Sequence, residues 1–136
     1  MKLTIYTDGG ARGNPGPAGI GAVILDDKNK TVREISKYIG EATNNQAEYQ
    51  ALIAGLQAAQ ELGAAEVSVV MDSELIIKQL KQEYKVRDKN LGALFIRAWN
   101  LLHGFKKYSL RHVLRHKNKK ADELVNRALD KNLTNS

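Results

Sequence analysis

Apolar and turn-forming residues alternate in blocks over the first 40 residues of the chain. Residues 2–8, about 18–26 and about 30–40 are rich in apolar and β-branched side chains and predict three strands, separated by the turn signals NPGP and DDKNK. Such short connections favour antiparallel pairing. We expect Asp8 to close the first strand, because the following GGARGNPGP is too rich in glycine and proline to continue a regular element.

Helical spacing begins after the third strand. Leucine or alanine recurs at positions 52, 56, 59 and 62, which predicts a helix from about Asn44 to Leu62 that ends at Gly63. A strand in VSVVMD, helices in SELIIKQLKQ and NLGALFIRAWNLLHGF, a final strand within KYSLRHVLRH and a last helix from near Lys119 follow. This order predicts an α/β fold with a five-stranded mixed sheet, three strands antiparallel and then two parallel, flanked by about four helices.

Length and composition narrow the class of protein. The 136 residues suit a single domain, expected over residues 1–131, and the polar residues 132–136 predict a flexible tail. The chain has no cysteine, which excludes disulfides and thiolate zinc sites. No stretch approaches the roughly 18 apolar residues of a membrane span, and the first residues lack a signal-peptide pattern. We therefore expect a cytoplasmic monomer without membrane contact.

The charge balance indicates a polyanionic partner, because the formal net charge is +6 although the chain holds 15 acids. The basic residues gather in two clusters that could line a phosphate track. The first cluster comprises Lys78, Lys81, Lys85, Arg87 and Lys89, and the second comprises Lys106, Lys107, Arg111, Arg115, Lys117, Lys119 and Lys120. A solvated helix face explains any single lysine better, so the inference rests on the clusters as a whole.

Four acids lie where predicted elements begin or end. Asp8 and Asp72 follow strands, and adjacent parallel strands would bring them together at one edge of the sheet. Glu48 continues the apolar stripe of the first long helix, where a buried carboxylate needs a partner. Asp122 lies near the start of the last helix. Together these acids predict a site for hard divalent cations, as a two-metal phosphodiester-cleaving enzyme requires.

Taken singly, two of these acids also have structural explanations. An Asp or Ser before ELII is a good helix cap, so Asp72 could serve as one. Asp122 could stabilise the amino terminus of its helix by its negative charge. The joint pattern of four acids at one edge of the sheet favours the metal site.

A capping box is expected at the start of the first long helix, because Gln46 follows Thr43 by three residues. This box would fix Asn44 and Asn45 on an exposed turn next to the acids. Their amides could then donate to sugar hydroxyls or base edges. Ordinary capping and turn roles remain open for each asparagine.

Four segments carry the four acids in the order Asp, Glu, Asp, Asp. They are YTDGGARGNPGPAGIGAVI, TNNQAEYQALIAGLQAA, VVMDSELIIKQL and NKKADELVNRAL. By these segments the chain resembles type 1 ribonucleases H over nearly its whole length, a far more specific signal than one short motif. The resemblance implies a ribonuclease H-like fold. It also implies an endonuclease that cuts the RNA strand of RNA–DNA hybrids with two Mg²⁺ or Mn²⁺ ions and leaves 5′-phosphate and 3′-hydroxyl ends.

The resemblance further implies a role for each site residue. Asp8 would bridge the two ions, Glu48 and Asp72 would complete the coordination of one ion, and Asp122 that of the other. Family members place the glycine-rich turn and the paired asparagines in the minor groove of the hybrid, where the 2′-hydroxyls of one strand are read. Carried over to this chain, the substrate contacts are Gly10, Arg12, Asn14, Asn44 and Asn45, with Thr43 near a DNA phosphate.

The chain departs from many bacterial relatives in the loop before the last acid, where those relatives carry a mobile histidine. Here the loop RHKNKKAD is short, with Arg115 seven residues before Asp122, as in archaeal-like members, and His116 beside it. Arg115 would act by its charge on phosphate and His116 by proton transfer, and the register favours Arg115. The long basic protrusion of some relatives and a separate hybrid-binding domain are missing, so binding should depend strongly on salt.

Three other interpretations of the sequence give the four acids different roles. A broader nuclease that also cuts double-stranded RNA is left open by Arg115 and the missing protrusion. A catalytically silent nucleic-acid-binding domain of the same fold is disfavoured, because such domains usually lose one or more of the acids, and all four are present. A structural α/β domain with fortuitous acids would leave the paired asparagines, the glycine turn and the charge excess without a common explanation.

Overall fold

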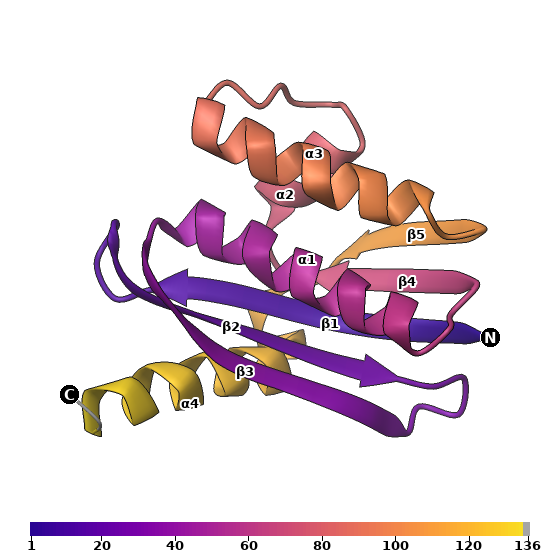
Figure 1. The fold of residues 1–136 in the computed structure, drawn as a ribbon, viewed down its shortest axis with the longest axis horizontal. Coiled ribbons are helices and arrows are strands. Elements are labelled where there is room, and N and C mark those ends of the chain that lie inside the picture. Colours follow the sequence, from indigo (N-terminus) through magenta and orange to yellow (C-terminus); the bar gives the residue numbers. More distant parts are fainter. Residues whose placement is uncertain (135–136) are drawn as a thin grey trace.

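The structure is a computed structural model, and it describes residues 1–134. A mixed sheet forms its centre, with helices on both faces (Figure 1). The strands are β1 (Lys2–Ala11), β2 (Gly16–Leu25), β3 (Thr31–Ala42), β4 (Glu66–Met71) and β5 (Lys107–His112). The helices are α1 (Asn44–Glu61), α2 (Glu74–Leu80), α3 (Lys89–His103), the 3₁₀ turn η1 (Arg115–Lys117) and α4 (Lys119–Thr134).

The sheet has the strand order β3-β2-β1-β4-β5. β2 pairs antiparallel with both β1 and β3, whereas β4 pairs parallel with both β1 and β5. α1 carries the chain from the edge strand β3 across the sheet to β4, and α2 and α3 supply the long crossover that the parallel neighbours β4 and β5 need. The predicted five-stranded mixed sheet, antiparallel and then parallel, is confirmed.

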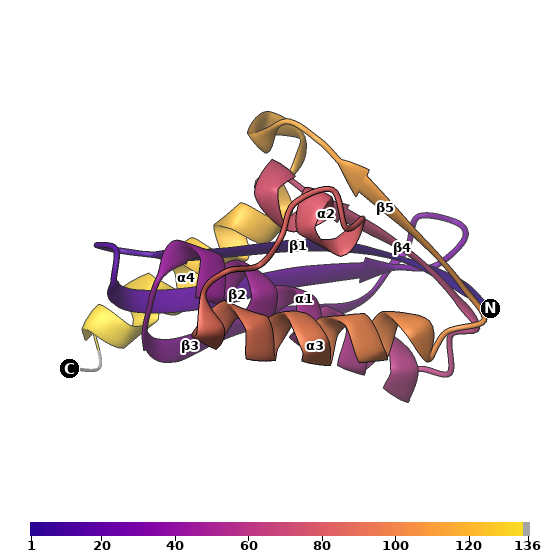
Figure 2. The ribbon, with the colours of Figure 1, turned by 90° about the horizontal axis from the view of Figure 1, so that it is seen from above.

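The two faces of the sheet are covered differently. Helices α1, α2 and α3 lie on one face, and α4 lies on the other (Figures 1 and 2). The core between the sheet and α1 includes Leu3, Ile5, Leu52 and Leu56, each at most 1% exposed. Burial of such side chains contributes about 1.5–3 kcal/mol each, so the helix that carries Glu48 is held firmly on the sheet.

The first strand is longer than the glycine-rich sequence predicts. β1 continues past Asp8 to Ala11, because Asp8–Ala11 remain paired with Gly21–Ala18 of β2. The expectation that Asp8 closes its strand is therefore wrong. Glycine is tolerated here because the neighbouring strand continues to supply backbone hydrogen-bond partners.

The last helix also exceeds its expected limit. α4 continues to Thr134, three residues into the segment for which a flexible tail is predicted, and the last two residues of that segment lie outside the described residues. No helix within residues 1–134 combines the length and the apolarity needed to cross a bilayer.

Candidate active site

Asp8 lies where β1 loses one of its two neighbours. The parallel pairing of β1 with β4 ends at Thr7 and Met71, while Asp8 still pairs with Gly21 of β2. The cleft thus arises because β4 stops, and not because β1 does. Asp8 is only 8% exposed, so its carboxylate occupies a confined space at the end of β4.

Glu48 reaches the same space from the second turn of α1. The predicted capping box is present: the backbone N–H of Gln46 donates to Thr43 Oγ1 at 3.1 Å, and the backbone N–H of Thr43 donates to Gln46 Oε1 at 2.9 Å. The predicted continuation of the buried stripe is confirmed too, since Glu48 is 7% exposed. Its Oε1 accepts the backbone N–H of Gly9, which lies beyond the end of the pairing with β4.

Glycine at position 9 is a condition for this contact. A Cβ atom there would lie 2.2 Å from the carbonyl oxygen of Ala47 in α1. Any larger residue would push α1 away from β1. Gly9 therefore fixes how closely Glu48 approaches Asp8.

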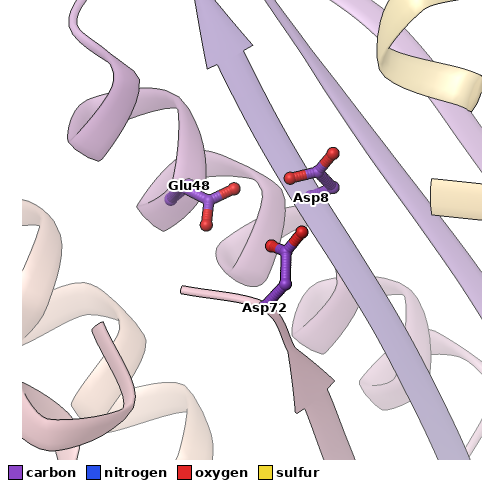
Figure 3. A group of neighbouring side chains, drawn as sticks. All are labelled: Asp8, Glu48 and Asp72. Carbon is purple, nitrogen blue, oxygen red and sulfur yellow. The ribbon is translucent and has the colours of Figure 1, made fainter. Parts of the chain in front are cut away.

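Asp72 directly follows β4 and completes a group of three carboxylates. Its neighbour Ser73, rather than Asp72, caps α2, because Ser73 Oγ accepts the N–H of Ile76 at 3.3 Å. The alternative of Asp72 as a helix cap is thereby removed. One carboxylate oxygen from each of Asp8, Glu48 and Asp72 lies within 4.8 Å of the others, and Figure 3 shows the three groups around one space.

The crowding of these carboxylates is visible in their pKa values. Burial and the nearby charge of Glu48 raise the pKa of Asp8 far above its ordinary value of 3.8. Burial also raises the pKa of Glu48, although the hydrogen bond from Gly9 opposes the shift, and burial raises that of Asp72. Several negative charges can coexist here only with protons or a bound cation, and an all-oxygen donor set suits Mg²⁺ or Mn²⁺.

The fourth acid, Asp122, lies in the first turn of α4, the helix on the other face of the sheet from α1 (Figure 1). A second glycine makes the close approach of this helix to the sheet possible, since a Cβ at Gly21 would lie 2.3 Å from the carbonyl oxygen of Ala121. Asp122 stands outside the group of three. Its carboxylate accepts a hydrogen bond from Arg115 Nη2 at 3.4 Å, and it retains 30% of its side-chain exposure.

All four acids line one hollow of about 530 Å³. Of the two loop candidates, Arg115 belongs to the described lining residues, whereas His116 follows it in η1 and is exposed. The lining residues are Asp8, Gly9, Gly10, Ala11, Arg12, Asn44, Asn45, Glu48, Asp72, Ser73, Arg115, Asp122, Val125, Asn126 and Leu129.

The predicted substrate residues divide into two groups. The first group lines the hollow and comprises Gly10, Arg12, Asn44 and Asn45. Asn14 and Thr43 support the turn behind it: Asn14 Oδ1 accepts the N–H of Asn44 at 3.0 Å, and Thr43 caps α1. Asn44 Oδ1 accepts the N–H of Ala11 at 2.8 Å, which ties α1 to the β1–β2 hairpin.

Arg12 has a partner within the chain. Its Nη2 lies 2.6 Å from Asp130 Oδ1 on α4, and the arginine side chain is 40% exposed. The pair holds the hairpin against α4, so an incoming phosphate would compete with Asp130 for the guanidinium group.

Asn118 is a site residue that the sequence analysis missed. It is 1% exposed, its side-chain Nδ2 donates to the carbonyl of Thr7 at 2.8 Å, and its backbone carbonyl accepts the N–H of Asp122 at 3.2 Å. Its side chain also lowers the pKa of Asp72 by hydrogen bonding. Asn118 thus links the segments that carry Asp8, Asp72 and Asp122. A polar residue four positions before a helical acid is a weak signal that sequence alone could not separate from a cap.

Comparison with known proteins identifies the family. A family model described as reverse transcriptase-like matches residues 6–128. The crystal structure of RNase H1 from Halobacterium salinarum superposes with a TM-score of 0.94 at 44% identity, covering 96% of this chain and 99% of that one. The chain belongs to the type 1 ribonuclease H family. The resemblance drawn from the four acidic segments is confirmed.

Two further relatives differ in how much of their own length this ribonuclease H domain covers. It is 47% identical over 131 residues to a bifunctional protein of Mycobacterium tuberculosis, covering 96% of this chain but 36% of that protein. It also superposes on LC11-RNase H1 in complex with an RNA/DNA hybrid, with a TM-score of 0.91 at 50% identity, covering 96% of this chain and 99% of that one. The chain therefore spans about a third of the mycobacterial protein and the whole fold of the LC11 enzyme.

Proposed function

We propose that this protein is an endonuclease that hydrolyses the RNA strand of RNA–DNA hybrids by a two-metal-ion mechanism, leaving 5′-phosphate and 3′-hydroxyl ends. The observation that carries the proposal is the group of three carboxylates whose oxygens lie within 4.8 Å of one another, with a fourth acid in the same hollow. Membership of the ribonuclease H family and the hybrid bound to LC11-RNase H1 support the choice of substrate.

The four acids provide suitable ligands for two divalent ions. Asp8, the central acid, would contact both ions, with Glu48 and Asp72 completing one coordination shell and Asp122 the other. When bound, such ions activate the attacking water and stabilise the leaving 3′-oxygen. Around them, the protein contributes by holding its carboxylates in place: the Gly9 N–H orients Glu48, and Asn118 orients the segments on either side.

Arg115 would assist catalysis through the positive charge of its guanidinium group. Its guanidinium group borders the hollow and reaches Asp122 at 3.4 Å, where it can hold a phosphate oxygen next to the reacting centre. In this role the arginine would neutralise charge, and His116 would have no direct part. The register of the sequence already favours Arg115 over His116, and the place of Arg115 among the described lining residues supports that preference.

The hybrid would be recognised by the part of the hollow that the start of α1 and the β1–β2 hairpin form. Asn44 and Asn45 at the start of α1, with Gly10 and Arg12 of the hairpin, would face the minor groove and test for 2′-hydroxyls. Asn14 would hold Asn44, and Thr43, at the exposed start of α1, would approach a DNA phosphate. A cytoplasmic location remains a prediction from the composition of the chain.

The test uses end-labelled RNA annealed to DNA, with Mg²⁺ or Mn²⁺, beside double-stranded RNA, single-stranded RNA and double-stranded DNA. We expect cuts confined to the RNA strand of the hybrid and abolished by chelator or by Asp8→Asn. Glu123→Gln is the matched control, because it removes an exposed acid next to Asp122 and should leave cleavage unchanged. Equal cutting of double-stranded RNA would identify the broader nuclease, and binding without cleavage would identify a silent domain.

A further inference from the structure

One part of the sheet surface is left open by the helices. α4 packs against β1, β2 and β3, and β4 and β5 extend beyond it on the same face (Figure 1). The other sides of β4 and β5 contribute Val67, Val69, Tyr108 and Leu110 to the contacts with the core under α1 and α3. Because side chains alternate along a strand, the intervening residues must point toward the open side.

The strand register arranges these residues in three rows across β1, β4 and β5. The rows are Lys2, Glu66 and Lys107; Thr4, Ser68 and Ser109; and Tyr6, Val70 and Arg111. Val70 is fully buried between Tyr6 and Arg111, and we call the other eight residues the open sheet face. Ser109 Oγ donates to Ser68 Oγ at 3.1 Å, so the central row presents hydroxyl groups along one line.

The open sheet face is positively charged at both ends. Its one acid, Glu66, is paired with Lys2 at 3.3 Å, whereas Lys107 and Arg111 are exposed. Lys106 adjoins the first row. Beside Tyr6, a hollow of about 310 Å³ is bordered by Lys117, Lys119 and Lys120. These residues belong to the second basic cluster of the sequence, which the candidate active site uses only through Arg115.

The β5 part of the face ends close to the active site. Tyr6 and Asp8 point to the same side of β1, two residues apart, which corresponds to about 7 Å along a strand. Exposed Arg111 pairs with Val70, two residues before Asp72, so a polynucleotide that leaves the acidic hollow along β5 meets Arg111 first and the hydroxyl row next. The face carries one half-buried aromatic ring, Tyr6, among spaced cations, features that suit unstacked bases better than a second duplex.

We propose that the open sheet face binds a single-stranded extension of the nucleic acid whose duplex part occupies the active site. This proposal rests on the proposed function for the identity of that duplex. Phosphates would contact Arg111 and Lys107, and one base would lie against the Tyr6 ring. The protein would accordingly prefer hybrids with a protruding single strand over blunt hybrids of the same length.

The test measures binding of the full chain in chelator, by fluorescence anisotropy, to a blunt hybrid and to the same hybrid with an extension of about ten nucleotides. RNA and DNA extensions at either end form separate arms. The test variant is Lys107→Glu/Arg111→Glu. Lys37→Glu/Arg97→Glu is the matched control, because it also lowers the formal charge from +6 to +2 and changes a hollow on the α1 side of the sheet.

We expect the parent and the control to bind the extended hybrid about tenfold more tightly than the blunt one. The test variant should lose this preference and keep its affinity for the blunt hybrid. For the extended hybrid, the slope of log affinity against log salt concentration should become shallower by about 1.4, since each phosphate contact on a single strand accounts for about 0.7. Equal affinity of the parent for both hybrids, or an equal loss by both double variants, would overturn the proposal.

Cleavage is measured separately with Mg²⁺. Cutting of the blunt hybrid by the test variant at the parental rate supports a surface that is distinct from the reacting centre. A parent that binds extended hybrids preferentially but cuts none would disprove the proposed function alone, because the binding assay needs no reaction.

Discussion

The inner acids and the outer acid reach one hollow by different means. Asp8 and Glu48 are 8% and 7% exposed and are fixed by close backbone contact between β1 and α1. Asp122 keeps 30% of its side-chain exposure and depends on Asn118 and Arg115. The inner acids are thus positioned by the close packing of the fold itself, whereas the carboxylate of the outer acid contacts a side chain, Arg115, that can be changed without disturbing that packing.

The largest effect should come from the centre of the inner group. Asp8→Asn removes the carboxylate shared by both proposed ion sites, and we expect cleavage to fall at least about a thousandfold, or about 4 kcal/mol of barrier. Hybrid cleavage under single-turnover conditions measures this loss. Turnover near that of the parent would refute the assignment of Asp8 as the central ligand.

The same substitution should stabilise the metal-free protein at high pH. The pKa of Asp8 is raised in the folded state, so above its ordinary value of 3.8 the folded protein holds a proton that the unfolded chain releases. The contribution of Asp8 to stability therefore falls as the pH rises from about 4 to 8. Asparagine does not ionise, so the free energy of unfolding of Asp8→Asn should be higher than that of the parent by at least about 1 kcal/mol at pH 8. Urea unfolding in chelator at pH 5 and pH 8 tests this; an equal pH dependence in both proteins would contradict it.

Gly9→Ala tests the packing that holds the inner group. The added Cβ would lie 2.2 Å from the carbonyl oxygen of Ala47, so we expect a loss of about 2–4 kcal/mol in the free energy of unfolding. A displacement of Glu48 should also lower cleavage about a hundredfold. Thermal unfolding and kcat/KM measure the two effects.

Gly92→Ala is the control for that substitution. Gly92 lies inside α3, and its added Cβ would meet no atom within 4 Å. Alanine should therefore stabilise the protein by about 0.5–1 kcal/mol without changing cleavage. If both glycine variants behaved alike, close approach of α1 to β1 would not be what positions Glu48.

Asn118→Ala tests how the segment that leads into Asp122 is anchored to β1. It leaves the buried carbonyl of Thr7 without its side-chain donor, so we expect a loss of about 1–3 kcal/mol in stability and about tenfold in cleavage. The loss should be partly rescued by a higher concentration of Mg²⁺, because displaced ligands weaken ion binding first. Asn126→Ala, which removes a 3.5 Å contact to the same acid at an exposed position, should change either quantity much less. Identical losses in the two variants would argue against a positioning role for Asn118.

The smallest effect is expected at the rim. Arg115→Ala removes one exposed charge, and we expect cleavage to fall about three- to tenfold, with Arg115→Lys retaining part of the activity. His116→Ala should stay within about twofold of the parent, since His116 has no place among the described lining residues of the hollow. A larger loss in His116→Ala than in Arg115→Ala, measured as kcat over a pH series, would reverse the two roles.

The sequence predicted those features that local chemistry determines. The capping box at Thr43 and the buried position of Glu48 follow from residue spacing within one helix, and both are present. The prediction that Asp8 ends its strand failed, because the extent of β1 depends on pairing with Gly21–Ala18 of β2, which no local pattern reports. Asn118 was missed for a similar reason: its partner Thr7 is 111 positions away. The close approach at Gly9 is likewise a tertiary contact, although a glycine next to a candidate acid could have suggested it.

The outermost strand of the sheet has a consequence for the association of one chain with another. β3 is a long edge strand of 12 residues, and a long unpaired edge can recruit a strand from a second molecule. Charged side chains punctuate it at Arg33, Glu34, Lys37 and Glu41, and its register with β2 shifts near Gly40, whose φ is +83°. Like the charges and bulges that protect natural sheet edges, these features oppose aggregation through β3.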